Sequence, residues 1–201
     1  MDTSYKSIVI PTETELTIKR SRFIGTAHPV EDADNAEKLI GEIKNRYQDA
    51  SHNCYAYLID ESNMRFSDDG EPQGTAGIPI LSVIKKRRLE KVIIIVTRYY
   101  GGVKLGSGGL VSAYSAAAST VLEKAGIRIY TLKVIVKLQL GYEQVKIFDL
   151  VLNENGATLL KIEYLDTVHY SLSIEHGKWR QLKNEILSIG IKIIEESTEF
   201  I

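Results

Sequence analysis

One segment of the chain combines basic, aromatic and glycine residues in a pattern suited to binding phosphate. It runs from residue 98 to residue 109 and reads RYYGGVKLGSGG. Glycines let backbone N–H groups approach a ligand closely, and the start of a following helix favours negative charge. The residues that we expect to contact nucleic acid are Arg98, Tyr99, Tyr100, Gly101, Gly102, Lys104, Ser107, Gly108 and Gly109.

The side chains of this loop indicate the class of ligand. Arg98 and Lys104 would supply positive charge, and Tyr99 and Tyr100 offer rings on which bases stack. The segment lacks the Gly-Lys-Ser/Thr ending of a P-loop and the spacing of a dinucleotide-binding fingerprint. A tight strand-to-helix turn with tyrosines in the core is the alternative interpretation, and the sequence leaves both open.

A second polar segment, residues 65–77, is rich in acidic residues and glycine. Asp68, Asp69 and Glu71 lie within four positions, which would suit a hard cation such as Mg²⁺ or acid–base chemistry. The spacing misses the EF-hand pattern. We favour an ordered acidic turn, in which the carboxylates accept hydrogen bonds from backbone N–H groups.

His52 and Cys54 form the third candidate, because a nucleophile and its base must lie within reach of each other. Two positions apart in a strand, their side chains point to the same side. However, Cys54 opens an apolar run, and buried free cysteines are commonly inert. We therefore expect no catalytic residue. The possible polar site consists of His52, Arg65, Asp68, Asp69 and Glu71.

The charge balance excludes a protein that binds nucleic acid over its whole surface. The 201 residues include 25 Lys and Arg and 26 Asp and Glu, for a net charge of −1. The segment from Lys85 to Lys104 is nevertheless strongly basic, so a local patch is compatible with the balance. The histidines show no zinc spacing, and we expect neither a metal nor a cofactor.

The chain carries no signal of an oxidising compartment or of a membrane. Cys54 is its single cysteine, so no disulfide can form within the chain. The N-terminus lacks the apolar core of a signal peptide, and no apolar run approaches the ~20 residues that span a bilayer. We expect a cytoplasmic protein without a membrane partner.

Helices and strands alternate in the first half of the chain, which predicts a sheet with helices packed on it. Residues 6–10 and 14–18 resemble a short hairpin around Pro11. Val92–Val96 has the composition of a buried strand, and helices are predicted over residues 78–88 and 109–124. The glycine loop therefore joins a buried strand to a helix.

The second half has the order strand, helix, strand, strand, helix, strand. Val134, Val136, Leu138 and Leu140 alternate with other residues as in a strand, and two more alternating runs follow a helical pattern. This order predicts a ferredoxin-like arrangement over residues 131–201. The pattern changes near Tyr130, where no flexible linker is visible.

Three of these motifs together resemble the signature of the YigZ/IMPACT family. They are residues 52–57, 66–77 and 97–114, and residues 21–24 also match. The resemblance implies an α+β protein of two domains, 1–130 and 131–201. The first would resemble domain IV of elongation factor G, a four-stranded sheet backed by helices, and the second its domain V. One departure is Ser112, which stands where the family often has a basic residue.

The resemblance implies less about function than about fold. Eukaryotic relatives regulate translation through the activation of an amino-acid-starvation kinase, and nucleic-acid or ribosome binding has been inferred for bacterial members. We expect an RNA- or ribosome-binding protein that modulates translation or a stress response. The alternatives are a metal-assisted hydrolase that uses Asp68, Asp69 and Glu71 with His52, and a regulator that binds a protein partner.

Overall fold

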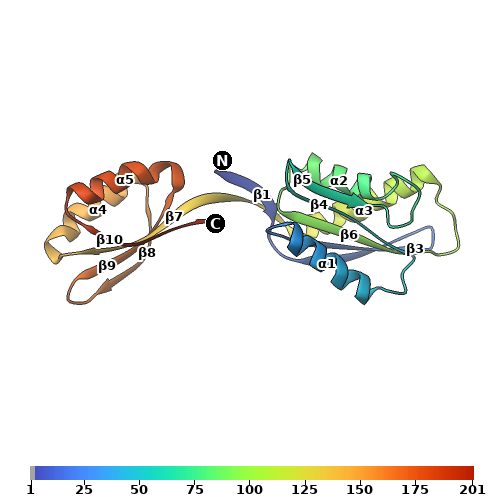
Figure 1. Ribbon diagram of the computed structural model, residues 1–201, viewed down its shortest axis with the longest axis horizontal. Coiled ribbons are helices and arrows are strands. Elements are labelled where there is room, and N and C mark those ends of the chain that lie inside the picture. Colours follow the sequence, from blue (N-terminus) through green and yellow to red (C-terminus); the bar gives the residue numbers. More distant parts are fainter. Residues whose placement is uncertain (1–2) are drawn as a thin grey trace. The chain divides into compact units, whose positions relative to one another are not determined.

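The computed structural model describes residues 3–201, which form two compact units (Figure 1). The larger unit comprises Lys6–Ile129. The smaller unit comprises Tyr130–Ile201 together with the N-terminal residues up to Tyr5. Each combines helices with a sheet, so the α+β fold class is confirmed. That segments 1–130 and 131–201 are separate domains stays a prediction.

The larger unit is built on a sheet with the strand order β2-β3-β6-β4-β5. The strands are β2 (Thr12–Ile18), β3 (Ser21–Pro29), β4 (His52–Asp60), β5 (Asn63–Ser67) and β6 (Val92–Tyr99). The helices are α1 (Ala33–Arg46), α2 (Gly77–Lys86) and α3 (Ser107–Ala125). All four strand pairs are antiparallel.

Helices cover both faces of this sheet, which explains why residues 54–59 of β4 and residues 92–96 of β6 are apolar throughout. Helices α2 and α3 pack on one face with Cys54, Ala56 and Ile94. Helix α1 packs on the other face with Tyr55 and Ile95. The central strand β6 therefore holds its carboxyl end, where the glycine loop starts, in a fixed place.

Two sequence-based expectations about this unit need correction. The sheet has five strands among the described residues, one more than the resemblance implied, because β5 forms just before the acidic turn, where we predicted no strand. The hairpin around Pro11 was wrong. Strand β2 pairs with β3 through a turn in which Lys19 and Arg20 have positive φ, and β1 (Ser4–Ile8) pairs with β7.

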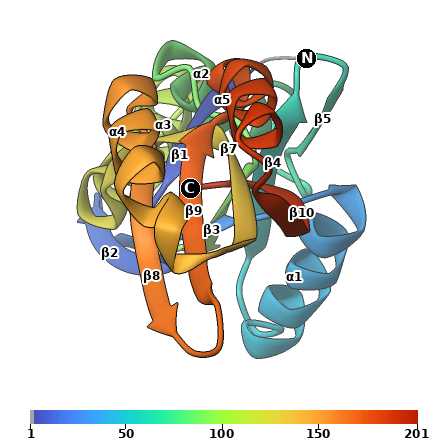
Figure 2. The ribbon, with the colours of Figure 1, turned by 90° about the vertical axis from the view of Figure 1, so that its left-hand side faces the viewer.

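The smaller unit has the expected ferredoxin-like order. Its elements are β7 (Ile127–Leu140), the short 3₁₀ helix η1 (Tyr142–Gln144), α4 (Val145–Asn155), β8 (Thr158–Tyr164), β9 (Val168–Glu175), α5 (His176–Ser188) and β10 (Lys192–Phe200). Strand β7 pairs with β9 and β10, and β8 forms an edge beside β9. Figure 2 faces this unit, with α4 and β8 on its left and α5 and β10 on its right.

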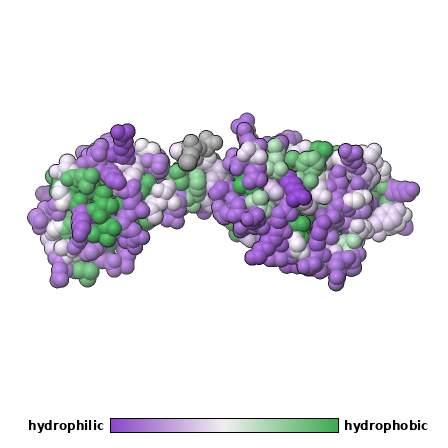
Figure 3. Space-filling model, viewed as in Figure 1, coloured by the Kyte–Doolittle hydropathy of each residue, from purple (hydrophilic) through white to green (hydrophobic). Residues whose placement is uncertain are grey.

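The core of the smaller unit lies between its sheet and its two helices. Val134, Val136 and Leu138 of β7 are buried against Phe148 of α4 and Trp179 of α5. Apolar side chains also gather below α5 on the face of this unit that Figure 3 shows. No helix in the described part of the chain is long and apolar enough to cross a bilayer.

Candidate functional site

A pocket of about 400 Å³ lies where β6 leads into α3, and it contains residues of both polar segments. It is lined by His52, Glu71, Pro72, Arg98, Tyr100, Lys104, Leu105, Gly106, Ser107 and Leu110. Strand β4 joins the segments, because it pairs with β6, which places His52 opposite Arg98, and also with β5, which places Ser67 at the start of the acidic turn opposite Tyr55. Two candidates that are separate in the sequence thus form one site.

Arg98 does not present its charge on the surface, as the sequence led us to expect. Its side chain is 6% exposed, and Nη1 donates to Oε1 of the equally buried Glu71 at 2.6 Å. Nη2 donates to Oγ of Ser21 at 3.3 Å. The guanidinium carbon lies 5.4 Å from the ring centres of both Phe23 and Tyr100. The charge of Arg98 is therefore balanced inside the protein.

One donor of Arg98 has no acceptor. Its Nε is buried and has no hydrogen-bond partner within the described residues. A buried polar group left in this state costs about 1–3 kcal/mol, and most such groups in proteins do have a partner. Because this Nε is buried, its missing bond is a local cost of enclosing Arg98 inside the protein.

The N-terminus of α3 is open toward the same pocket. Its first flanking residue, Gly106, has a φ of 75°, no side chain caps the helix, and its first turn carries no acidic residue. Ser107 and Gly108 are exposed. The first N–H groups of a helix have no partner within it, and they favour an anion. This end of α3 meets the conditions for binding phosphate.

The glycines of the loop have different physical roles. Gly102 and Gly106 adopt positive φ, which strains other residues. A Cβ at Gly101 would collide with the backbone carbonyl of Arg20. Gly108 differs, because it is helical and nothing lies within 4 Å of the position of a Cβ. The fold itself therefore gives no reason for glycine at position 108.

The structure places Tyr100 and Lys104 at the pocket and Tyr99 outside it. Tyr100 is 49% exposed and lines the pocket together with the exposed Lys104. Tyr99 does not line it. The hydroxyl of Tyr99 donates to Asp49 at 2.8 Å, and its ring lies 5.2 Å below the guanidinium of Arg22. Tyr100 is the aromatic residue that a ligand in this pocket can reach.

Asp68 organises the acidic turn. Its Oδ1 accepts hydrogen bonds from the backbone N–H groups of Ala76 and Gly77, at 3.0 and 2.8 Å, and its Oδ2 accepts from Gly74 at 2.7 Å. These bonds tie the turn to the start of α2. The ordered acidic turn that we favoured from the sequence is the arrangement found.

Asp69 and Arg65 point elsewhere and do not line the pocket. Burial alone would raise the pKa of Asp69, but hydrogen bonds from Nζ of Lys44 and the backbone N–H of Asn53, each 2.6 Å long, hold it below its ordinary value. Arg65 pairs with Glu37 of α1 at 2.8 Å. No group of three or more His, Cys, Asp or Glu side chains within residues 3–201 is arranged to hold a metal ion.

Cys54 and His52 do not form a nucleophile–base pair. The thiol of Cys54 lies 3.0 Å from the carbonyl of Asp68 and 3.4 Å from the hydroxyl of Tyr114, and burial raises its pKa to about 12. Nδ1 of His52 donates to the carbonyl of Asp69 at 2.9 Å, which leaves Nε2 at 3.9 Å from Glu71. His52 therefore belongs to the pocket, and Cys54 to the core.

Sequence reasoning missed Tyr114 as a member of this network. It lies within the helix predicted over residues 109–124, and its ring is fully buried against Phe23. Its hydroxyl donates to Glu71 at 2.7 Å, so Glu71 accepts from both Tyr114 and Arg98. The available signal was a phenol on an otherwise apolar helix face, because a buried hydroxyl needs a partner.

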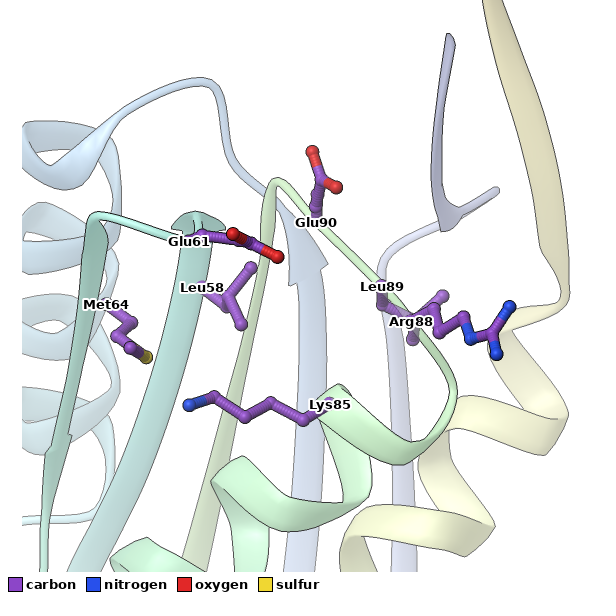
Figure 4. A pocket seen from close by; sticks show the side chains of 7 residues that line it. All are labelled: Leu58, Glu61, Met64, Lys85, Arg88, Leu89 and Glu90. Carbon is purple, nitrogen blue, oxygen red and sulfur yellow. The ribbon is translucent and has the colours of Figure 1, made fainter. Parts of the chain in front are cut away.

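Within the basic run 85–88, Lys86 and Arg87 line one pocket, whereas Lys85 and Arg88 line a different pocket of about 600 Å³. Lys85 reaches toward Met64 of β5, whereas Arg88 points away from it (Figure 4). The carboxylates of Glu61 and Glu90 also line this pocket. Its mixed charge makes it a poor site for phosphate, and it shares no lining residue with the pocket at α3.

Comparison with known proteins identifies the family. Residues 19–122 match the family model described as the Impact N-terminal domain. This range is more than half of the chain, and it includes every residue that lines the pocket at α3. The chain belongs to the IMPACT family.

Relatives of this IMPACT protein occur in bacteria and in animals. It is 38% identical to IMPACT family member YvyE of Bacillus subtilis, over 86% of this chain and 80% of that protein. It is 32% identical to IMPACT family member YigZ of Escherichia coli, over 73% of this chain and 74% of that protein. Protein IMPACT of Rattus norvegicus is 30% identical over 54% of this chain and 36% of the rat protein.

A solved structure extends the similarity to nearly the whole chain of this IMPACT protein. That structure, titled "Crystal structure of an hypothetical protein", superposes with a TM-score of 0.66 at 26% identity. The superposition covers 96% of this chain and 97% of the other. Both units of the fold therefore have counterparts in a known structure.

Proposed function

We propose that this IMPACT family protein binds single-stranded RNA at the pocket between β6 and α3. The observation that carries the proposal is the uncapped N-terminus of α3, which opens on a pocket that Lys104 and Tyr100 also line. A phosphate of the RNA backbone has the required oxygens and charge.

The pocket supplies two kinds of contact. The N–H groups of the first turn of α3 and the ammonium of Lys104 would bind a phosphate, and the helix end favours the anion by about 0.3–1 kcal/mol. The exposed ring of Tyr100 would stack with a base, which contributes about 1–3 kcal/mol for each base. The Arg98–Glu71 pair holds the guanidinium against the Tyr100 ring and keeps that ring in place. Stacking on Tyr100 therefore stabilises the complex more than the helix end does.

A protein that binds RNA or the ribosome in this way is suited to modulate translation or a stress response, and this role places it in the cytoplasm. The hydrolase alternative loses its support, because Asp68 and Asp69 already bind backbone N–H groups and Lys44. Nuclease treatment distinguishes the alternative of a protein partner from the proposal of RNA binding. Ribosomal association that depends on RNA contacts is lost after digestion, whereas a protein–protein contact survives it.

The proposal predicts salt-dependent binding that needs Lys104. In fluorescence anisotropy with a labelled single-stranded RNA, log K should fall by ~0.7 per phosphate contact for each tenfold rise in salt. Lys104→Ala should weaken binding and reduce this slope by about one contact. Lys38→Ala is the matched control, because Lys38 is an exposed lysine of α1, which packs on the opposite face of the sheet.

Comparison of the two lysine variants distinguishes RNA binding at this pocket from general electrostatic attraction between the protein and RNA. Equal losses in Lys104→Ala and Lys38→Ala would mean that charge, and not the pocket, binds RNA. Absence of RNA binding and of ribosome co-sedimentation at low salt would refute the proposal.

A further inference from the structure

Strand β8 lies at one edge of the sheet in the smaller unit, and it exposes apolar side chains. Strand β8 pairs with β9 on one side, and no strand within residues 3–201 pairs with its other side. Leu159, Leu160 and Tyr164 are 47%, 53% and 62% exposed, and Leu165 just beyond the strand is 64% exposed. An open edge with such side chains is a template for another strand.

Two opposite charges stand in the middle of this edge. Lys161 and Glu163 lie on the same face of the sheet, opposite Ser171 and His169 of β9. Nζ of Lys161 and Oε1 of Glu163 are 2.8 Å apart, and the side chains are 63% and 50% exposed. Ile162 lies between them on the other face. The charges are thus arranged symmetrically about Ile162.

We propose that β8 pairs with β8 of a second copy of this chain, antiparallel, about a two-fold axis at Ile162. Two-fold pairing places the same strand on both sides of the interface. In this register Lys161 of each copy lies opposite Glu163 of the other, so each interface contains two cross-strand pairs of opposite charge. Strand β8 is irregular at Leu160, where a bulge separates Leu159 from Lys161, so the regular pairing spans residues 161–163 and Tyr164 of one copy approaches the bulge of the other.

The charges also select this register over its neighbours. A two-fold axis that keeps each face of the sheet continuous passes through a single residue of the strand. An axis at Lys161 would place Lys161 opposite itself, and an axis at Glu163 would place Glu163 opposite itself. Like charges directly opposite each other are unfavourable. Among these three central registers, the one at Ile162 alone pairs opposite charges.

The edge strands β10, β2 and β5 are poorer candidates for self-pairing, and pairing about the centre of β5 would place Arg65 opposite itself. Strand β10 carries Glu195, Glu196 and Glu199, and β2 carries Glu13 and Glu15. A second copy aligned on either strand would bring carboxylates together, which is a common protection of sheet edges. Strand β8 combines exposed apolar side chains with two opposite charges, Lys161 and Glu163, each of which would lie opposite the other residue in the second copy.

Sedimentation velocity of the full-length protein over a range of concentrations tests this inference. The wild-type protein should dimerise. Lys161→Glu and Glu163→Lys should each weaken the dimer about tenfold or more, because each creates two like-charge pairs. The double variant Lys161→Glu/Glu163→Lys should restore dimerisation, since it exchanges the charges across the axis. Unchanged circular dichroism would show that all three variants fold.

A second exposed pair provides the matched control. Arg22 of β3 and Glu15 of β2 are 2.8 Å apart and 51% and 47% exposed, and both belong to the larger unit. Arg22→Glu should leave the dimer constant unchanged. A wild-type protein that stays monomeric at the highest concentration would overturn the inference. So would single variants at position 161 or 163 that dimerise like the wild type.

Discussion

Individual residues of the pocket act through partners that lie far apart in the sequence. Glu71 accepts hydrogen bonds from Arg98 and Tyr114, and Arg98 donates in turn to Ser21. These residues come from β3, β6, α3 and the acidic turn. A charge in this network cannot be removed alone, because its partner would remain buried without compensation.

This network predicts a large loss of stability in Arg98→Met. The substitution leaves the carboxylate of Glu71 buried without its cation, which typically costs about 3–5 kcal/mol. The double variant Arg98→Met/Glu71→Gln should regain part of this loss in a denaturant titration. Arg22→Met is the matched control. Arg22 pairs with Glu15 in solvent, with both side chains about half exposed, so little change is expected. Equal effects of Arg22→Met and Arg98→Met would contradict this account of the buried pair.

At the scale of elements, helices and strands with a clear hydrophobic periodicity could be predicted from the sequence, but the pairing of some strands could not. The alternation in β7 and the order of the smaller unit follow from periodicity, because one face of each element is buried. The pairing of β1 with β7 could not be foreseen, since a five-residue strand of mixed polarity carries little information about its partner. Strand β5 was missed because only Met64 and Phe66 interrupt its polar sequence.

Only part of the candidate site could be predicted from the sequence, because local spacing does not show which distant residues come into contact. Lys104, Tyr100 and Ser107 were recognised from local spacing, and they line the pocket, although the helix was predicted to begin at residue 109 and begins at Ser107. The burial of Arg98 was not recognised. It depends on Glu71, 27 positions away, and on the pairing of β3 with β6. Local patterns identify such residue types, but only the fold decides which charges neutralise each other.

The turn before α2 predicts a structural role for Asp68. Asp68→Ala removes the acceptor of three backbone N–H groups at or before the first turn of α2. We expect a loss of about 2–4 kcal/mol in the free energy of unfolding, because bonds to a charged acceptor exceed ordinary ones. Glu61→Ala is the control, since Glu61 is exposed in the preceding turn. An Asp68→Ala protein as stable as the wild type would contradict this structural role and would favour a role for the carboxylate in binding or catalysis.

At the scale of the whole molecule, the first described residues belong to the unit formed by the end of the chain. The ring of Tyr5 stacks on Tyr130 with centres 5.2 Å apart, and it meets Phe200 edge-on at 4.8 Å. The N-terminal segment therefore contributes to the smaller unit, although it precedes the larger one in the sequence.

This arrangement predicts that Tyr5→Ala destabilises one unit selectively. Each aromatic pair contributes about 0.5–1.5 kcal/mol beyond burial, and the substitution removes two. Amide hydrogen exchange should accelerate in β7 and β10, while β4 and β6 exchange as in the wild type. Tyr99→Ala is the control, because Tyr99 lies in the larger unit. Faster exchange in β4 and β6 of the Tyr5 variant would contradict the assignment of the N-terminal residues.

The central claim is that RNA approaches the backbone at the start of α3, and Gly108→Ala tests it most directly. The added methyl meets no protein atom within 4 Å, and alanine favours a helix over glycine by about 0.5–1 kcal/mol. We expect a protein at least as stable as the wild type, with RNA affinity reduced about tenfold or more in the anisotropy titration. Unchanged affinity in a stable Gly108→Ala protein would contradict the claim.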